Sequence, residues 1–267
     1  MTEPRWQPTL LIRASIVLHG LALLLVIVEP GLWRWVLVAV LANHLLLTLQ
    51  GLWPRSHWLG PNWTRLPAAA TARNEIALTI DDGPDPLVTP QVLDILERYA
   101  VRATFFCIGE NAARYPDLCR EIVRRGHAVE NHSQHHRHHF SLLGPAGFRR
   151  ELQTAQNTLT KITGEKPLFF RAPAGLRNPF LDPVLARLGL RLASWSMRAF
   201  DTRTGDSGRV IGKLSGGLQA GAILLLHDGN AARTPDGTPV ILKALPALLS
   251  SAAAANLRFI TLRQALS

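Results

Sequence analysis

Two short segments of the sequence contain residue types that bind metal ions. Thr79-Ile80-Asp81-Asp82-Gly83-Pro84 places two adjacent carboxylates directly after an apolar run. Adjacent carboxylates repel each other, and a cation relieves that repulsion. Further along the chain, His132 and His136 stand four positions apart, in a stretch of eight residues that holds five of the ten histidines. On one turn of a helix, imidazoles at this spacing converge and can share an ion.

Each segment has a simpler interpretation when taken alone. An Asp-Gly-Pro sequence is more often an exposed turn, and a histidine-rich stretch can be a polar loop. Together they predict a divalent ion held by Asp82, His132 and His136. Two imidazoles and one carboxylate leave coordination positions open, which is typical of a catalytic ion. Such an ion lowers the pKa of a water molecule towards neutrality, so the pattern predicts a hydrolase.

Three further segments each end an apolar run with a residue capable of chemistry. In Phe170-Arg171-Ala172-Pro173-Ala174-Gly175, the arginine can hold a carboxylate in a bidentate contact, and backbone N–H groups of the turn can face an oxyanion. Asp201 follows Trp195-Ser196-Met197-Arg198-Ala199-Phe200, and His227 follows Ile223-Leu224-Leu225-Leu226. A histidine at the open end of a strand suits a general acid.

Hydrophobic periodicity predicts the elements that position these residues. The expected strands are 75–80, 103–108, 128–131, 168–171, 192–196, 222–226 and 259–261, and the expected helices are 90–99, 116–125, 148–163, 182–188 and 241–254. Alternating strands and helices predict a parallel α/β sheet or barrel, with chemistry at the carboxyl ends of the strands. That rule selects Asp81, Asp82, His132, Arg171, Asp201 and His227 as candidate site residues.

The start of the chain is far more apolar than the rest. Residues 9–28 and 32–52 each approach the roughly 20 residues that a helix needs to cross a bilayer, and Glu29-Pro30-Gly31 between them predicts a turn. Five of the seven tryptophans flank these segments, where interfacial aromatics belong. We therefore expect a hydrophobic helical hairpin that anchors the chain in a membrane (1–53), a linker (54–74) and a catalytic domain (75–267).

Two other interpretations of the apolar start stay open. One is a cleaved signal peptide, although no small-x-small site closely follows the first apolar run. The other is a pair of helices lying on the membrane surface. A hairpin keeps the N-terminus and the catalytic domain on one side. The flanking arginines, which are Arg5 and Arg13 before it and Arg55, Arg65 and Arg73 after it, favour the cytoplasmic side.

The net charge of the chain indicates which classes of binding partner to expect. The net charge is +10, but no basic stripe with interleaved aromatics occurs, so nucleic-acid binding is not expected. A basic surface facing anionic lipid headgroups fits this composition better. Cys107 and Cys119 are too few for a disulfide framework. Membrane lipid and the substrate are the expected partners, and no protein partner is predicted.

Taken in order, the five segments and Ala103-Thr104-Phe105-Phe106 resemble the polysaccharide deacetylases of carbohydrate esterase family 4, over about residues 75 to 266. The resemblance implies a distorted (β/α) barrel with about seven strands, here preceded by two hydrophobic helices. It implies one divalent ion, zinc above others, and hydrolysis of an N-acetyl group on an amino sugar. The expected location is a bacterial inner membrane. Members of this family usually act outside the cytoplasm, whereas the flanking arginines of this chain favour the cytoplasmic side.

The resemblance also assigns roles to individual residues. Asp82, His132 and His136 would hold the metal. Asp81 would be the base for attack by a water molecule held on that metal, and His227 the acid that protonates the leaving amine. Arg171 would orient Asp81, and Asp201 would orient and tune His227. The backbone N–H of Ala174 would stabilise the oxyanion, and Leu225 would line the acyl pocket.

Three positions depart from the family pattern. Ala174 stands where an aromatic residue is usual, Thr202 where a tryptophan often follows the aspartate, and Arg198 where an acid is usual. All three departures would affect the substrate pocket rather than the metal. The expected substrate is an amino-sugar polymer or oligomer, and the alternative is a lipid-linked amino sugar that is deacylated or deformylated at the membrane. A non-catalytic sugar-binding module is disfavoured because the metal and acid–base residues are all present.

Overall fold

The computed structural model describes residues 6–267, so Arg5 lies outside the described residues. Its centre is a curled sheet in which every pairing is parallel, with strand order β5-β4-β3-β2-β1-β7-β6 and with β8 beside β1. The strands are β1 (Glu75–Asp81), β2 (Thr104–Cys107), β3 (Ala128–Asn131), β4 (Phe169–Phe170), β5 (Arg191–Leu192), β6 (Met197–Arg198), β7 (Ile223–His227) and β8 (Arg258–Phe259). The expected distorted barrel is confirmed.

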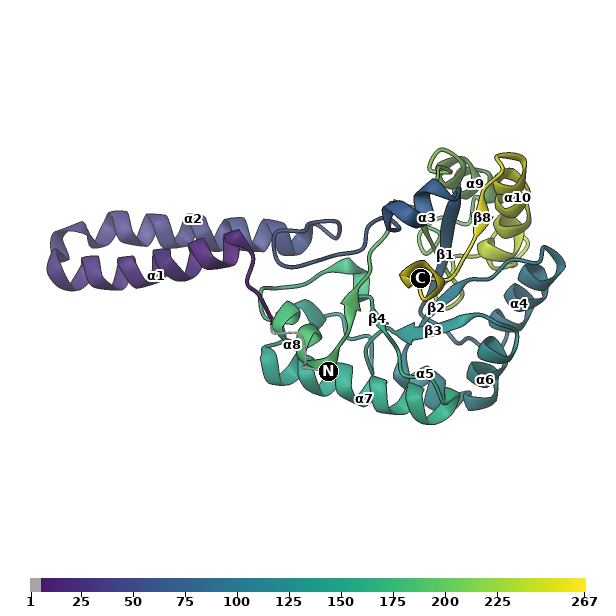
Figure 1. Cartoon of the computed structure of the whole chain (residues 1–267), viewed down its shortest axis with the longest axis horizontal. Helices are drawn as coiled ribbons and strands as arrows, with labels where there is room; N and C mark the ends of the chain where they lie inside the picture. The colour runs from purple at the N-terminus through teal and green to yellow at the C-terminus, as the bar shows by residue number, and fades with distance from the viewer. Residues whose placement is uncertain (1–5) are drawn as a thin grey trace.

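Helices cover the outside of this sheet (Figure 1). They are α4 (Thr89–Arg98), α5 (Gly109–Arg114), α6 (Pro116–Arg124), α7 (Pro145–Thr163), α8 (Leu181–Leu188), α9 (Ser207–Ser215) and α10 (Val240–Ala254). The short helix α3 (Ala68–Ala72) instead contributes Ala70 to the apolar cluster inside the barrel. Sequence periodicity missed α3, α5 and α9. The strand expected at 192–196 is wrong, because the chain leaves β5 after Leu192 and re-enters the sheet only at Met197 as β6.

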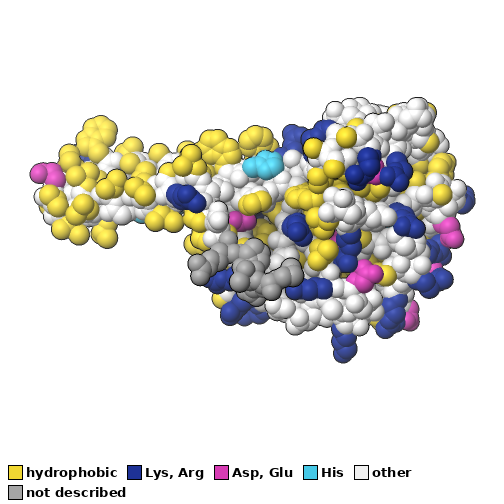
Figure 2. Space-filling view, in the orientation of Figure 1, with side chains coloured by type: hydrophobic (Ala, Val, Ile, Leu, Met, Phe, Trp, Pro, Cys, Tyr) yellow, Lys and Arg dark blue, Asp and Glu magenta, His cyan; other side chains and the backbone are white. Residues whose placement is uncertain are grey.

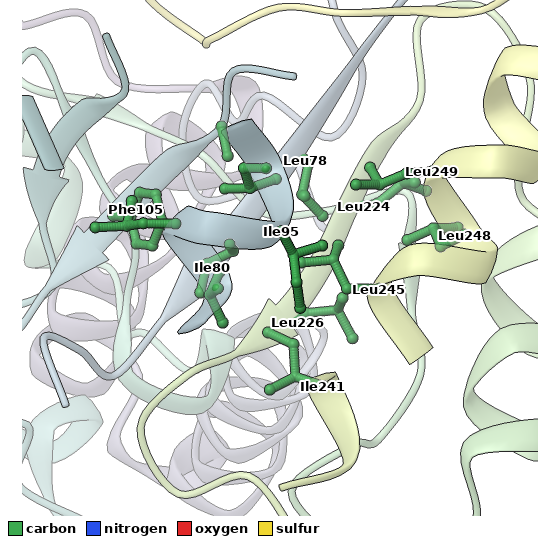
Figure 3. Packing of buried hydrophobic residues seen from close by; sticks show 14 of the residues in the cluster. Leu78, Ile80, Ile95, Phe105, Leu224, Leu226, Ile241, Leu245, Leu248 and Leu249 are labelled. Atoms are coloured by element: carbon green, nitrogen blue, oxygen red, sulfur yellow. The ribbon is translucent and has the colours of Figure 1, made fainter. Parts of the chain in front are cut away.

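Side chains along β1 and β7 point alternately to the surrounding helices and to the barrel interior, and this alternation positions the site residues. In β1 and β7, Leu78, Ile80, Leu224 and Leu226 face the helices and pack against α4 and α10 in one buried apolar cluster, seen in Figure 3. Alternate residues of a strand point to the opposite face. Thr79, Asp81, Leu225 and His227 therefore face the barrel interior, and the register pairs Asp81 with His227 at the carboxyl edge.

The two hydrophobic N-terminal helices, α1 (Leu10–Val28) and α2 (Trp33–Leu52), form an antiparallel hairpin that projects from the barrel (Figure 1). Each is long and apolar enough to cross a membrane, and only 11% of each candidate span is buried. Figure 2 shows hydrophobic side chains along the whole projection and most basic side chains on the globular part.

The foot of the hairpin is fixed to the barrel. Trp6 Nε1 donates to Asp182 Oδ2 at 2.7 Å, and the backbone N–H of Arg177 donates to the carbonyl of Gly51 at 3.1 Å. A Cβ on Gly51 would lie 2.2 Å from the carbonyl oxygen of Arg177, so only glycine allows this approach of α2 to the barrel.

The segment 54–74 runs along the barrel and makes backbone contacts with it. Trp63 donates its backbone N–H to Leu192 and accepts from Ser194, and Leu66 donates to Gly221. Leu66 also joins the apolar core inside the barrel. The expected boundary between linker and catalytic domain at residue 75 stays a prediction, but these contacts hold the hairpin foot close to the sheet.

Candidate active site

Asp82, His132 and His136 meet at the carboxyl edge of the sheet. The Nε2 atoms of His132 and His136 lie 3.1 and 3.2 Å from Asp82 Oδ1. Their potential ligand atoms all lie within 4.8 Å of one another. The structure thus brings together the three residues that the sequence selected as metal ligands.

The helical turn predicted for the two histidines is wrong. Residues 132–139 form a loop after β3, with left-handed backbone at Ser133 (φ 64°) and His136 (φ 49°). Asn131 Oδ1 accepts from the N–H of Ser133, and the Ser133 hydroxyl accepts from the N–H of His136. Two short polar side chains therefore shape the turn that aims both rings at Asp82.

The hydrogen bonding of His132 tests whether a cation fits here. His132 Nδ1 lies 2.8 Å from the carbonyl oxygen of Arg171 and must donate to it, since a carbonyl only accepts. Against its burial, the charges of Asp81 and Asp82 raise the pKa of His132, so a proton on Nε2 pairs with Asp82 when no ion is bound; without that proton the two acceptors would repel at this distance. A cation between them removes the repulsion, so the donor set fits a divalent ion.

The electrostatics of the cluster agree with that assignment. Burial opposes ionisation of Asp82, but the hydrogen bond and charge of His132 hold its pKa well below its ordinary value. Burial and the neighbouring His132 lower the pKa of His136 to about 4, so that ring is neutral. A metal ion binds a carboxylate and neutral imidazoles, so a bound ion would take the place of the proton on His132.

Asp81 is held by a fully buried arginine. Arg171 Nη1 lies 2.6 Å from Asp81 Oδ1 and 2.8 Å from the Thr79 hydroxyl. Its other nitrogens donate to the carbonyls of Ala193 and Ser194. Burial lowers the pKa of Arg171, an effect that Asp81 opposes. With its donors satisfied, the guanidinium fixes one oxygen of Asp81 and leaves the other near His132, 3.8 Å from Nε2.

His227 and Asp201 form a second buried pair. Asp201 Oδ1 lies 2.9 Å from His227 Nδ1, and Oδ2 accepts from the backbone N–H of His227 at 2.7 Å. Burial disfavours the charged ring, but the hydrogen bond and charge of Asp201 outweigh it and raise the pKa of His227 to about 9. The ring is therefore a proton donor at neutral pH, with Nε2 the atom left for another partner.

The remaining predicted residues lie at the same edge. Ala174 is exposed and has left-handed backbone (φ 54°) in the turn Pro173–Gly175. Leu225 is buried one pleat below His227 on the same strand face. Arg198 pairs in register with Leu225, and its guanidinium lies over the rings of Trp195 and Phe200, at 5.1 and 4.4 Å from their centroids.

Sequence reasoning missed three polar residues around Asp82. Asn230 Nδ2 lies 3.4 Å from Asp82 Oδ2, and Asn111 Nδ2 donates to the Asp82 carbonyl at 3.0 Å. Asp228 accepts a hydrogen bond from the Thr89 hydroxyl below this loop, and burial raises its pKa to about 7. The signal available was the run His227-Asp228-Gly229-Asn230, in which only the histidine was selected.

The family model for polysaccharide deacetylases matches residues 68–193. A chitooligosaccharide deacetylase of Azorhizobium caulinodans is 38% identical over 167 residues, which cover 61% of this chain and 78% of the relative. A peptidoglycan-N-acetylglucosamine deacetylase of Bacillus cereus is 32% identical over 193 residues, covering 72% of this chain and 87% of the relative.

A solved structure has the same architecture. It is a family 4 carbohydrate esterase from Streptomyces lividans in complex with acetate, with a TM-score of 0.63 and 31% identity. The alignment covers 69% of this chain and 91% of that structure.

Proposed function

The chain belongs to the polysaccharide deacetylase family of carbohydrate esterases, and we propose that it removes an N-acetyl or other N-acyl group from an amino sugar of a poly- or oligosaccharide. The family resemblance drawn from the motifs is confirmed, and the chain is an enzyme of the carbohydrate deacetylase class. The observation that supports the specific reaction is the meeting of a cation site with the Asp81–Arg171 and His227–Asp201 pairs at one edge of the sheet.

Asp82, His132 and His136 are the residues proposed to hold one divalent ion, zinc above others by the family resemblance; their imidazole and carboxylate ligands are compatible with it. When bound, the ion would lower the pKa of a water molecule and polarise the acyl carbonyl. Arg171 and its bond to Asp81 place a carboxylate beside this centre to accept the proton of the attacking water.

The rest of the reaction uses this chain's other groups. His227 donates its Nε2 proton to the amine nitrogen as the C–N bond breaks, and Asp201, which accepts from Nδ1, orients the ring and favours its protonated form. The backbone N–H of Ala174, an exposed residue between the buried Pro173 and Gly175, donates to the carbonyl oxygen as negative charge develops there. Leu225, below His227, bounds the space for the acyl methyl group.

Turnover on a panel of N-acylated amino sugars, measured by mass spectrometry, tests the proposal. We expect the full-length protein to release the acyl group, and His227→Ala to lower kcat by about 100-fold or more because a general acid is lost. His139→Ala, in an exposed position of the same histidine-rich stretch, is the control and should keep full activity. Unchanged turnover in His227→Ala would remove His227 from the mechanism.

We also propose that the hairpin of α1 and α2 spans a membrane, which makes a lipid-linked amino sugar the second candidate substrate. The exposed apolar side chains of both helices support this proposal, since water would not solvate them well. The full chain should sediment with membranes, resist extraction by alkaline carbonate and enter solution with detergent. Release by carbonate would contradict a spanning hairpin, and a reporter fused at the C-terminus would give the side of the membrane.

A further inference from the structure

A cavity outside the candidate active site lies where the foot of the hairpin meets the sheet. Its volume is about 370 Å³, and residues 53–55 form one wall. The other wall is residues 195–198 with Phe200, in the segment that leads to Asp201. The cavity thus lies between the end of the hairpin and the segment that leads to Asp201, the partner of His227.

This cavity adjoins the proposed reaction centre. A Cβ on Gly175 would lie 2.6 Å from both Pro54 Cβ and a ring atom of Trp195, so the turn that carries Ala174 packs against both walls. The Ser194 hydroxyl donates to the carbonyl of Pro54 at 2.7 Å and holds the walls together. A sugar bound with its acyl group at Ala174 would extend into this cavity.

The cavity is positively charged. Arg55 and Arg198 line it, and none of the residues described as lining it carries a carboxylate. Arg55 Nη1 donates to the Ser196 carbonyl at 3.2 Å. Arg198 stacks on Trp195 and Phe200, and its Nε is buried with no hydrogen-bond partner among the described residues. An anion with several oxygens, such as a phosphate, would pair with the exposed Arg55 and with the accessible part of the Arg198 guanidinium.

An apolar groove of about 480 Å³ lies at the same foot of the hairpin and shares no lining residue with this cavity. It includes Leu52, next to Trp53 in the chain, and runs between the hairpin and the loops 141–142 and 177–183. Its walls include Ile12, Ile16, Leu47, Leu142, Phe180 and Pro183. Because α1 and α2 have the length of membrane spans, the groove opens towards the depth at which lipid chains lie.

The polar residues of the hairpin also face each other at this end. Ser15 accepts from Asn43 at 2.8 Å, and the Nε2 atoms of His19 and His44 lie 3.3 Å apart. Ser15, His19 and His44 line the groove. Polar groups at membrane depth commonly mark a functional path, and here they mark the side of the hairpin that faces the groove.

We propose that the substrate is an N-acylated amino sugar attached through a phosphate to a membrane lipid. The phosphate binds between Arg55 and Arg198, the sugar reaches the metal-ligand cluster past Gly175, and the lipid chain lies in the groove. The inference rests on the proposed deacylase function and names its substrate class. Charge in the cavity, the apolar groove at the same hairpin foot and the membrane-length hairpin favour this occupant over a neutral polymer.

The test compares three forms of the amino sugar that the panel above identifies. They are the sugar linked through phosphate to an isoprenoid chain, the same sugar phosphate without a chain, and a neutral oligomer of the sugar. Full-length protein in lipid nanodiscs is assayed for acyl release. We expect kcat/KM to be highest for the lipid-linked form, by about tenfold or more over the neutral oligomer, since the oligomer offers no charged group to the two arginines.

Variants separate the two parts of the proposed site. Arg198→Gln should lower the ratio of kcat/KM for the sugar phosphate over the neutral oligomer by about tenfold, whereas Arg209→Gln, an exposed arginine of α9, should leave the ratio unchanged. Leu142→Ala with Phe180→Ala should lower the ratio of lipid-linked over chain-free sugar phosphate. Both side chains are exposed in the groove wall, so their truncation should not unfold the barrel. Leu87→Ala, an exposed leucine outside the groove, is the control.

Three results would overturn the inference. Equal kcat/KM for the neutral oligomer and the lipid-linked sugar would refute a lipid-linked substrate and would leave the proposed deacylase function intact. Equal losses on charged and neutral substrates in Arg198→Gln would give that arginine a structural role instead. Absence of turnover on all three forms by metal-loaded protein would refute the deacylase function, and the inference with it.

Discussion

The pair of His227 and Asp201 makes the pH dependence of the enzyme testable by one substitution, Asp201→Asn. Burial disfavours the charged imidazole, yet the hydrogen bond and charge of Asp201, with further contributions from Asp81 and Asp82, raise the pKa of His227 to about 9. Asparagine keeps the size of the side chain and removes its charge. Burial then dominates, and we expect the pKa of His227 to fall below its ordinary value of about 6.5.

The magnitude follows from that difference. A fall from about 9 to about 6.5 is worth about 3 kcal/mol, at about 1.4 kcal/mol for each pKa unit. The side chain of His227 is only 10% exposed, so solvent screening reduces this value little. At pH 8 the protonated fraction falls from about nine-tenths to a few per cent, which alone lowers kcat/KM about 30-fold if the imidazolium is the acid.

The same pair contributes to stability in a defined pH range. A raised histidine pKa stabilises the folded state fully below the unfolded-state pKa of about 6.5, and the contribution is lost as the pH rises through about 9. Asp201→Asn should therefore lower the free energy of unfolding most near pH 6, and the deficit should shrink at pH 9 and above.

The assay is the pH profile of kcat/KM for wild type, Asp201→Asn and a control, Asp117→Asn, whose side chain is 96% exposed. We expect the alkaline limbs of wild type and control to coincide below pH 9, and that of Asp201→Asn to lie at least two pH units lower. A bound cation lowers the pKa of His227 in all three proteins, so the displacement between profiles is the quantity to compare. An alkaline limb that stays in place in Asp201→Asn would refute His227 as the acid.

Three further predictions concern the framework. Arg171→Met should lower the free energy of unfolding by about 3–5 kcal/mol in denaturant titrations, because it leaves a buried carboxylate unpaired; a loss under 1 kcal/mol would contradict the paired geometry. Leu245→Ala, in the cluster between α10 and the sheet, should cost about 2–5 kcal/mol by the same measurement, and a neutral result would contradict the packing seen there. Gly51→Ala should increase protease cleavage between hairpin and barrel, because the new Cβ meets a backbone oxygen of Arg177, whereas Gly20→Ala has open space and should behave as wild type; equal cleavage of both would contradict a fixed hairpin foot.

Asp81, Arg171 and His227 were predictable as site residues because each directly follows an apolar run. Parallel strands bring their carboxyl ends to one edge, so Asp81, Arg171 and His227 meet without any knowledge of the loops between them. The spacing of His132 and His136 suggested a helix that does not form. There, hydrogen bonds from Asn131 and Ser133 give the same convergence with a left-handed turn.

Features that depend on contacts between distant segments could not be predicted. The strand expected at 192–196 is broken because Ser194 turns away to bind Trp63 and Pro54, residues that composition assigned to a linker. The cavity of Arg55 and Arg198 has the same origin, since its walls lie more than a hundred residues apart in the chain. Periodicity describes one element at a time and carries no information on such pairings.

The dependence of acyl release on an ion held by this chain's own residues tests the central claim most directly. Full-length protein purified without metal-affinity steps is analysed by inductively coupled plasma mass spectrometry and assayed on an N-acetylated amino sugar. We expect about one divalent ion per chain, loss of both ion and activity in Asp82→Ala, and recovery of wild-type activity when chelated protein is reloaded with zinc. Metal-free protein that releases acetate at an undiminished rate would contradict the account.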